Sequence, residues 1–184
     1  ELAGSADSNT LREYVNEAFS EESLGEVERR VNEALVAELP KKVTKKAQEL
    51  VIDIHDQAFY GKAEGLLKYA SRGQAKAGTT YFYRIATAYL IYQGMRVTLG
   101  VVFVHSGMSL AQCIVRLIQH VKAQKIKLGC LFLDRGFAGI EIYRCLQRRH
   151  IPAIIACPIR GKEGGSKALC QGRQSYTATH TFRS

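Results

Sequence analysis

The chain lacks several patterns that would assign it to a familiar functional class. Its five cysteines form no CxxC pair, so the ligand spacing of a structural zinc site is absent. There is no internal repeat and no Gly-rich loop of the kind that holds phosphate. Every apolar run stops well short of the roughly 20 residues that span a bilayer. These absences argue against a zinc module, a P-loop nucleotide-binding protein and a membrane partner.

The cysteines also bear on the expected compartment. Their number is odd, no secretory signal precedes them, and most lie inside apolar runs, where cysteine usually behaves as a small core residue. This pattern is typical of a reducing environment. We therefore expect a cytoplasmic protein, associated with the nucleoid if it binds DNA.

Negative charge is in short supply. Lys and Arg number 26 against 17 Asp and Glu, which gives a formal net charge of +9. Such a balance favours association with a polyanion, and nucleic acid is the first candidate. The bias is not specific, because many basic proteins bind no nucleic acid.

Hydrophobic periodicity divides the chain into a helical segment over residues 1–48 and an α/β core over 49–184. Residues 8–19 and 23–39 both have helical spacing, and Pro40 ends the second pattern. Two functions are open for these helices: a pair that binds DNA or dimerises, or a lead-in that packs on the core.

The core alternates expected strands and helices. We predict a strand at 50–54, a basic loop at 63–78, and a hairpin of residues 79–92 and 95–105 around Gln93-Gly94. An amphipathic helix from Leu110, a strand at 129–133, a helix from Ile140 and a strand at 151–157 follow. This order predicts a mixed sheet flanked by helices, opened by an antiparallel meander and continued through helical crossovers.

Two of the expected strands end in aspartate, in the stretches LVIDIHD and CLFLDRG. Asp134 alone has a simple interpretation as a helix N-cap. If the two strands are neighbours, however, Asp53 and Asp134 converge at one sheet edge and repel each other unless a cation binds between them. Carboxylate oxygens suit Mg²⁺ or Mn²⁺, and such sites perform phosphoryl-transfer chemistry.

Three stretches carry a resemblance to a known family: VIDIHDQAFYGK, GTTYFYRIATAYLIYQGMRVTLGVVFV and LFLDRGFAGIEIYRCLQRRHIPAIIACPIRGK. Together they resemble the catalytic core of DDE-type insertion-sequence transposases, over roughly residues 49–162. The DRGF segment between strand and helix is the most specific part. The resemblance implies an RNase H-like fold, with Asp53 and Asp134 as the first two catalytic and metal-binding acids.

The resemblance also implies the activity and its partners. Such enzymes use divalent metal, Mg²⁺ or Mn²⁺, to cleave double-stranded DNA at transposon ends and to join it to target DNA, and a homodimer is one arrangement. Arg135 matches the family motif and either contacts phosphate or pairs with a carboxylate. We expect further phosphate contacts from a set of basic residues that flank the carboxylate edge: Lys62, Lys68, Arg72, Lys76, Arg160 and Lys162.

One departure from the family concerns the third acid, a Glu on a late helix. Glu141 is too close to Asp134, and Glu163 lies in a Gly-rich stretch. We therefore expect an incomplete core with little cleavage activity, with His55, Asp56 and Glu163 as candidate accessory groups. His55 is more commonly a structural residue than a ligand, and Asp56 is equally a turn residue. Two alternatives stay open: a transposase remnant that binds DNA or self-associates without catalysis, and another RNase H-like nuclease.

Overall fold

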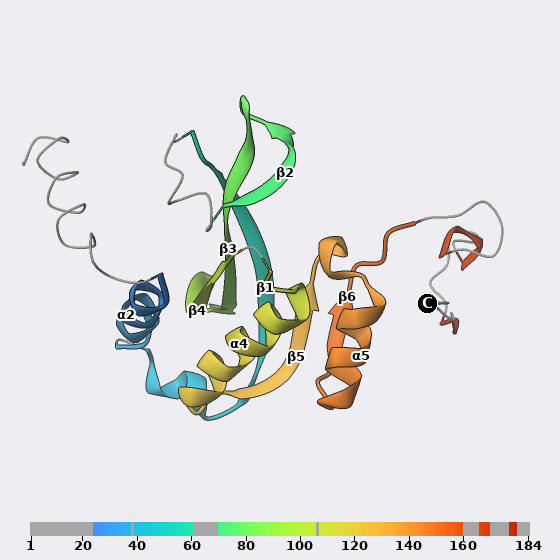
Figure 1. Ribbon diagram of the computed structural model, residues 1–184. Coiled ribbons are helices and arrows are strands. Elements are labelled where there is room, and N and C mark those ends of the chain that lie inside the picture. The colour runs from blue at the N-terminus through green and yellow to red at the C-terminus, as the bar shows by residue number, and fades with distance from the viewer. Residues whose placement is uncertain are drawn as a thin grey trace, which may run out of the picture.

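The computed structural model describes residues 24–37, 39–60, 70–105, 107–159, 166–169 and 177–179. Its centre is one mixed sheet of six strands (Figure 1). The strands are β1 (Ala47–Ala58), β2 (Ser71–Lys76), β3 (Thr79–Tyr92), β4 (Met95–Val104), β5 (Lys127–Leu133) and β6 (Ala153–Ile155). The helix expected over residues 8–19 lies outside the described residues.

β3 is the hub of the sheet. One of its edges pairs antiparallel with β1, and the other pairs antiparallel with β4 over one half and with β2 over the other. β5 then adds parallel to β1, and β6 adds parallel to β5. The expected meander and the helical crossovers to parallel strands are therefore confirmed.

The β3–β4 hairpin follows directly from its turn residues. Gln93 and Gly94 both have positive φ, at 51° and 78°. This backbone matches the twist of the flanking strands, and it is the conformation that an X-Gly pair adopts most readily. The turn thus places Tyr92 opposite Met95 and sets the register as far as Tyr89 and Thr98, beyond which an irregularity shifts the pairing by one residue, to Ala88 opposite Gly100.

The expected basic loop at 63–78 is wrong in its second half. Ser71–Lys76 forms β2, which pairs with the start of β3 through a tight turn at Ala77 and Gly78. The strand was missed because its sequence, SRGQAK, is polar and contains glycine. Pairing to β3, and not β-propensity, makes it a strand.

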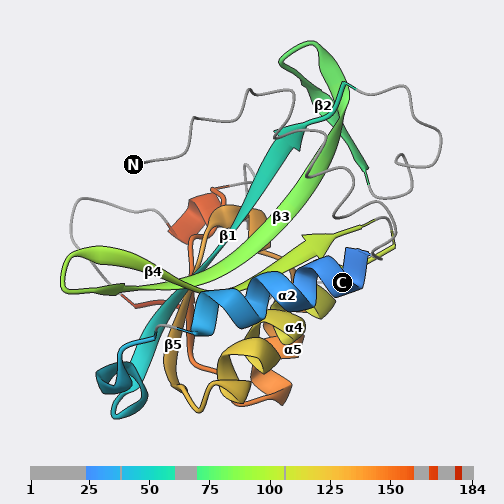
Figure 2. The same cartoon turned by 90° about the vertical axis from the view of Figure 1, so that its left-hand side faces the viewer.

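Helices α4 (Leu110–Ala123) and α5 (Ile140–Arg148) cover one face of the sheet, as Figure 2 shows edge-on. Alternate residues of β1 and β5, among them Ile52 and Leu133, pack against Ile114 and Leu117 of α4 in the main core. Cys113 is buried there, and its burial raises the pKa of the thiol to about 12. It is therefore neutral at physiological pH and acts as a small apolar residue.

Helix α2 (Leu24–Val36) closes the free edge of β4 in an unusual way. The Asn32 side chain donates to the Val101 carbonyl and accepts from the Val101 N–H, both at 2.8 Å. The Glu28 carboxylate accepts from the N–H of Phe103 at 2.8 Å and pairs with Arg116 of α4. These two side chains occupy the place of a further strand, which relieves the unpaired edge that a sheet otherwise exposes.

The sequence predicted only an apolar stripe for this helix. The stripe is half-buried, whereas the fully buried positions are the polar Glu28 and Asn32. Sequence periodicity missed them because a polar residue is scored as exposed unless its partners are known. Within the described ranges, no helix is long and apolar enough to cross a membrane.

We predict that Asn32→Ala destabilises the protein by about 1–3 kcal/mol, because it leaves a buried N–H and C=O of β4 without partners. The exposed Glu33 on the same helix is the matched control, and Glu33→Ala should cost at most about 0.5 kcal/mol. Urea-induced unfolding followed by circular dichroism measures both. Equal free energies of unfolding for the two variants would contradict the role of Asn32.

Candidate functional site

The central feature is the relation between Asp53 and Asp134. β1 and β5 pair in parallel with Ile52 opposite Leu133. The next residue after each of these is an aspartate, so Asp53 and Asp134 lie side by side where the pairing of the two strands ends. The two strands are adjacent, as expected, and Asp134 directly follows β5; the expected end of the first strand after residue 54 is wrong, because β1 continues past Asp53 to Ala58 along β3.

Both aspartates belong to the sheet face that α4 and α5 leave uncovered. Residues of a strand alternate between faces, and Leu50 and Ile52 of β1 point into the core. Asp53 therefore points to the opposite face, and its side chain is 36% exposed. Asp134 continues the alternation of β5 in extended backbone and is exposed. The two carboxylates thus share one solvent-accessible surface.

Asp134 also acts as a helix N-cap, the simpler role that its position in the sequence predicted. Its Oδ1 accepts from the Gly136 N–H at 2.9 Å and so caps the short 3₁₀ helix η2 (Arg135–Phe137). A Cβ on Gly136 would lie 3.1 Å from this oxygen, tighter than an ordinary contact. Because Gly136 has no Cβ, the Asp134 carboxylate has room to accept the hydrogen bond from the Gly136 N–H. The capping and site interpretations are compatible, because the cap uses only one of the two oxygens.

The candidate accessory groups lie in different directions. His55 is on the same face as Asp53, and its Nε2 is 3.2 Å from Asp53 Oδ2. Asp56 is on the opposite face, where it pairs with Arg84 at 2.8 Å. Its carboxylate is thus engaged away from the two aspartates. Glu163 lies outside the described residues.

The basic residues that were predicted to contact phosphate also lie in different places. Arg135 directly follows Asp134 and is exposed, and it forms no ion pair with a carboxylate in the part of the chain that the structure describes. Arg72 and Lys76 lie on β2, as cross-strand neighbours of Tyr81 and Thr79. The remaining predicted contacts lie outside the described residues: Lys62, Lys68, Arg160 and Lys162.

Sequence reasoning missed one arginine next to the aspartates. The Arg96 guanidinium lies 3.8 Å from the Tyr89 ring centroid and donates to Thr87 Oγ1 at 3.1 Å. Thr87 is the direct cross-strand neighbour of Asp53. This places a cation over the same face, one strand away from the carboxylate. A hairpin register derived from the turn at Gln93-Gly94 would have revealed it.

The side chains around Asp53 and Asp134 supply only some of the ligands that a divalent ion needs. Two adjacent carboxylates suit Mg²⁺ or Mn²⁺, since such ions commonly take one or two protein carboxylates and complete their shell with water or phosphate oxygens. Among the described residues, no three His, Cys, Asp or Glu side chains gather closely enough to form a metal site. The face can therefore offer two carboxylates, with the remaining ligands supplied from outside this set.

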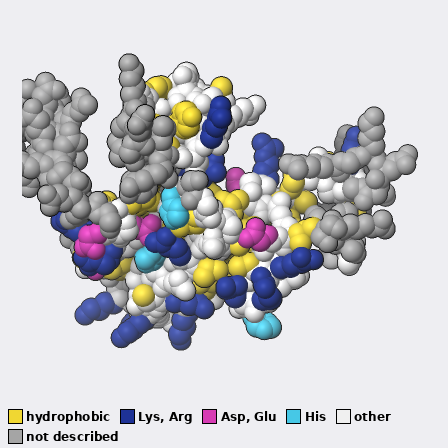
Figure 3. All heavy atoms as spheres, in the orientation of Figure 1, with side chains coloured by type: hydrophobic (Ala, Val, Ile, Leu, Met, Phe, Trp, Pro, Cys, Tyr) yellow, Lys and Arg dark blue, Asp and Glu magenta, His cyan; other side chains and the backbone are white. Residues whose placement is uncertain are grey.

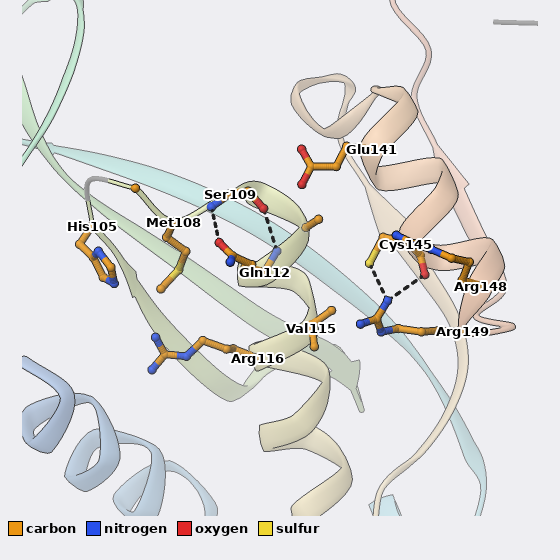
Figure 4. Close-up of a pocket in the computed structure, with 12 residues that line it drawn as sticks. His105, Met108, Ser109, Gln112, Val115, Arg116, Glu141, Cys145, Arg148 and Arg149 are labelled. Carbon is orange, nitrogen blue, oxygen red and sulfur yellow. Dashed lines mark hydrogen bonds between the residues drawn. The ribbon is translucent and has the colours of Figure 1, made fainter. Parts of the chain in front are cut away.

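A cleft of about 820 Å³ lies away from the two aspartates. It lies between α4 and α5, on the other face of the sheet (Figure 4). Several of its polar groups are already engaged: Ser109 and Gln112 form the capping box of α4, and Arg149 Nη1 donates to the Cys145 carbonyl at 3.5 Å. Neither aspartate lines it. Figure 3, which views this helical face, shows Lys and Arg side chains over its lower half and few acidic ones.

Comparison with known proteins supports the fold. No protein-family model matches the chain, and no curated protein matches it. Among solved structures, the chain is similar to the piggyBac transposase of a cryo-EM synaptic complex with hairpin DNA, with a TM-score of 0.51 and 14% identity. The match covers 92% of this chain but only 34% of that one. The fold is a mixed α/β sheet flanked by helices, consistent with the RNase H-like class that the sequence predicted.

Two substitutions of Asp134 separate its capping role from charge repulsion with Asp53. Asp134→Ala removes the cap and should lower the free energy of unfolding by about 0.5–2 kcal/mol. Asp134→Asn keeps a capping oxygen but removes the charge. Because two like charges about 4 Å apart repel by about 1 kcal/mol in water, this variant should be as stable as the wild type or more stable by up to about that amount.

Thermal unfolding in EDTA is the measurement for both variants. Equal losses in Asp134→Asn and Asp134→Ala would mean that the carboxylate charge itself stabilises the fold and that Asp53 does not repel it.

Proposed function

We propose that this chain carries the first two acids of a DDE-type transposase core, with Asp53 and Asp134 as metal ligands and DNA as the substrate. The observation that supports this most is the register of β1 and β5, which aligns two aspartates from distant parts of the sequence on one exposed face. A fold similar to a solved transposase adds to it. Insertion-sequence transposases are the family that the DRGF stretch resembles.

In this proposal, each residue has a limited task. Asp53 and Asp134 would hold Mg²⁺ or Mn²⁺, and a bound divalent ion activates the attacking oxygen and stabilises the leaving one in phosphoryl transfer. Asp134 is oriented for this by its bond to the Gly136 N–H. Arg135 and Arg96 lie beside the aspartates as cations that can hold DNA phosphate. Double-stranded DNA, as transposon ends and target, is the proposed partner, and a homodimer is the proposed assembly.

The proposal predicts a metal-dependent gain in stability. By mass action, Mn²⁺ at ten times its dissociation constant should stabilise the folded chain by about 1.4 kcal/mol. Asp53→Asn and Asp134→Asn should lose this gain. Asp56→Asn, a substitution in the same strand but on the opposite face, should keep it. Thermal unfolding with and without Mn²⁺ provides the measurement, and a gain that survives in both Asp53→Asn and Asp134→Asn would place the ion elsewhere.

A second candidate function is DNA binding without catalysis. It is favoured by the finding that the described residues offer two carboxylates and no third ligand. A two-metal site generally needs further carboxylates to hold both ions. Basic residues such as Arg72, Lys76 and Arg135 would still bind DNA, because the release of counterions from the phosphates, which provides the affinity, requires no metal.

Incubation of the 184-residue chain with DNA and Mg²⁺ or Mn²⁺, beside Asp53→Ala and Asp134→Ala, tests both functions. We expect all three proteins to retain DNA, with binding that weakens steeply as salt rises, and to cleave it little or not at all. Robust cleavage by the unmodified chain alone would show that a further ligand comes from outside the described residues, and Glu163 is the first to mutate. Failure to bind DNA at low salt would contradict both functions.

A further inference from the structure

The sheet extends beyond the two aspartates as a narrow ribbon. β5 stops pairing with β1 at Ile52, whereas β3 continues along β1 to Ala58 and β2 joins on its other side. Figures 1 and 2 show this ribbon of β1, β2 and β3 standing out from the body of the protein. From Asp53 to Phe59 it measures about 20 Å, at about 3.3 Å per residue.

The face of the ribbon that continues from Asp53 is aromatic. β1 and β3 pair without a bulge, so Asp53, Gln57 and Tyr83 share one face. The Phe59 N–H donates to the Tyr81 carbonyl at 2.9 Å, and the Phe59 and Tyr83 rings lie 4.9 Å apart at 53°. Tyr81 completes the group and is 37% exposed. Three rings therefore follow one another on the surface that leads away from the carboxylates.

Cations flank these rings on the same face. Arg72 is the cross-strand neighbour of Tyr81, and Lys76 is that of Thr79. Both are exposed and form no ion pair among the described residues. Arg84 and Asp56, which do pair, lie on the reverse face. The side that continues from Asp53 thus combines rings with cations that no described carboxylate neutralises, whereas Arg84 on the reverse side is neutralised by Asp56.

We propose that Phe59, Tyr81 and Tyr83, with Arg72 and Lys76 beside them, bind an unpaired nucleic-acid strand that continues to Asp53 and Asp134. Bases of an unpaired strand stack on aromatic side chains, and neighbouring cations hold the backbone. A base-paired duplex keeps its base faces covered, so duplex alone would leave the rings unused. The inference rests on the proposed DNA function and deepens it, because it assigns a strand state to the segment next to the carboxylates.

A simpler role for the rings is cross-strand packing that stabilises a thin ribbon. Substitution of Tyr81 separates the two roles. Tyr81→Phe keeps a ring for stacking, whereas Tyr81→Val keeps β-propensity but offers no ring. Ile91→Val is the control, since Ile91 is exposed on the same strand and face but has no ring.

The test is fluorescence anisotropy with labelled single-stranded, forked and blunt duplex DNA, in EDTA so that metal and cleavage play no part. Tyr81→Val should bind single-stranded and forked DNA about five-fold or more weakly, with duplex affinity unchanged. Tyr81→Phe and Ile91→Val should bind all three as the wild type does. Arg72→Gln should reduce the slope of log affinity against log salt concentration for single-stranded DNA, by the amount that corresponds to about one phosphate contact.

A second readout needs no variant with weakened binding. The chain contains nine tyrosines and no tryptophan, so tyrosine emission can be measured directly. Single-stranded DNA should quench part of it, and Tyr81→Phe should lose part of that quenching while it keeps its affinity.

Unchanged single-strand affinity in Tyr81→Val, or an equal loss for blunt duplex, would overturn the proposal. Because these measurements exclude metal, they can fail while metal-dependent cleavage succeeds, and the reverse holds equally.

Discussion

The parallel pairing of β1 with β5 is the constraint on which the rest of the arrangement depends. Leu50 and Ile52 of one strand and Leu131 and Leu133 of the other face the same core, packed under α4. A slip of one residue in either strand would turn its apolar set to solvent and its aspartate into the core. The hydrophobic effect thus sets the register, and the register brings the carboxylates together. Their mutual repulsion is small beside the burial of four aliphatic side chains, at about 1.5–3 kcal/mol each.

Much of this could be predicted from the sequence. Strands and helices with strong apolar patterns lie close to where they were expected, and the turn at Gln93-Gly94 fixed its hairpin. The adjacency of Asp53 and Asp134 followed from two apolar runs that each lead into an aspartate, although β1 itself continues past Asp53 to Ala58. These features are local, or depend on a single pairing between buried strands. The catalytic and metal-binding roles of the two aspartates remain predictions.

The features that sequence could not provide depend on contacts between distant segments. β2 is a strand only because β3 lies beside it, and Glu28 and Asn32 are buried only because the edge of β4 needs their oxygens and nitrogens. Arg96 approaches the Asp53 face because the hairpin register carries it across Tyr89. In each case a polar residue has a neighbour that composition and periodicity do not encode. The assumption that a polar residue is exposed fails at Glu28 and Asn32, and at β2 and Arg96 the missing information is the identity of the neighbour.

The closure of β4 by side chains from α2 has a consequence for how the protein can be cut or joined. An additional strand would bond to β4 through regular backbone hydrogen bonds. Here the edge of β4 is instead covered by one amide and one carboxylate side chain on adjacent turns of α2. A shortened chain that begins after α2 would keep its core yet present a bare backbone edge at Val101 and Phe103. Such an edge recruits the strand of another molecule. Helix α2 therefore prevents β4 from pairing with a strand of another molecule. Fusion or truncation points are best chosen upstream of Leu24, where α2 begins.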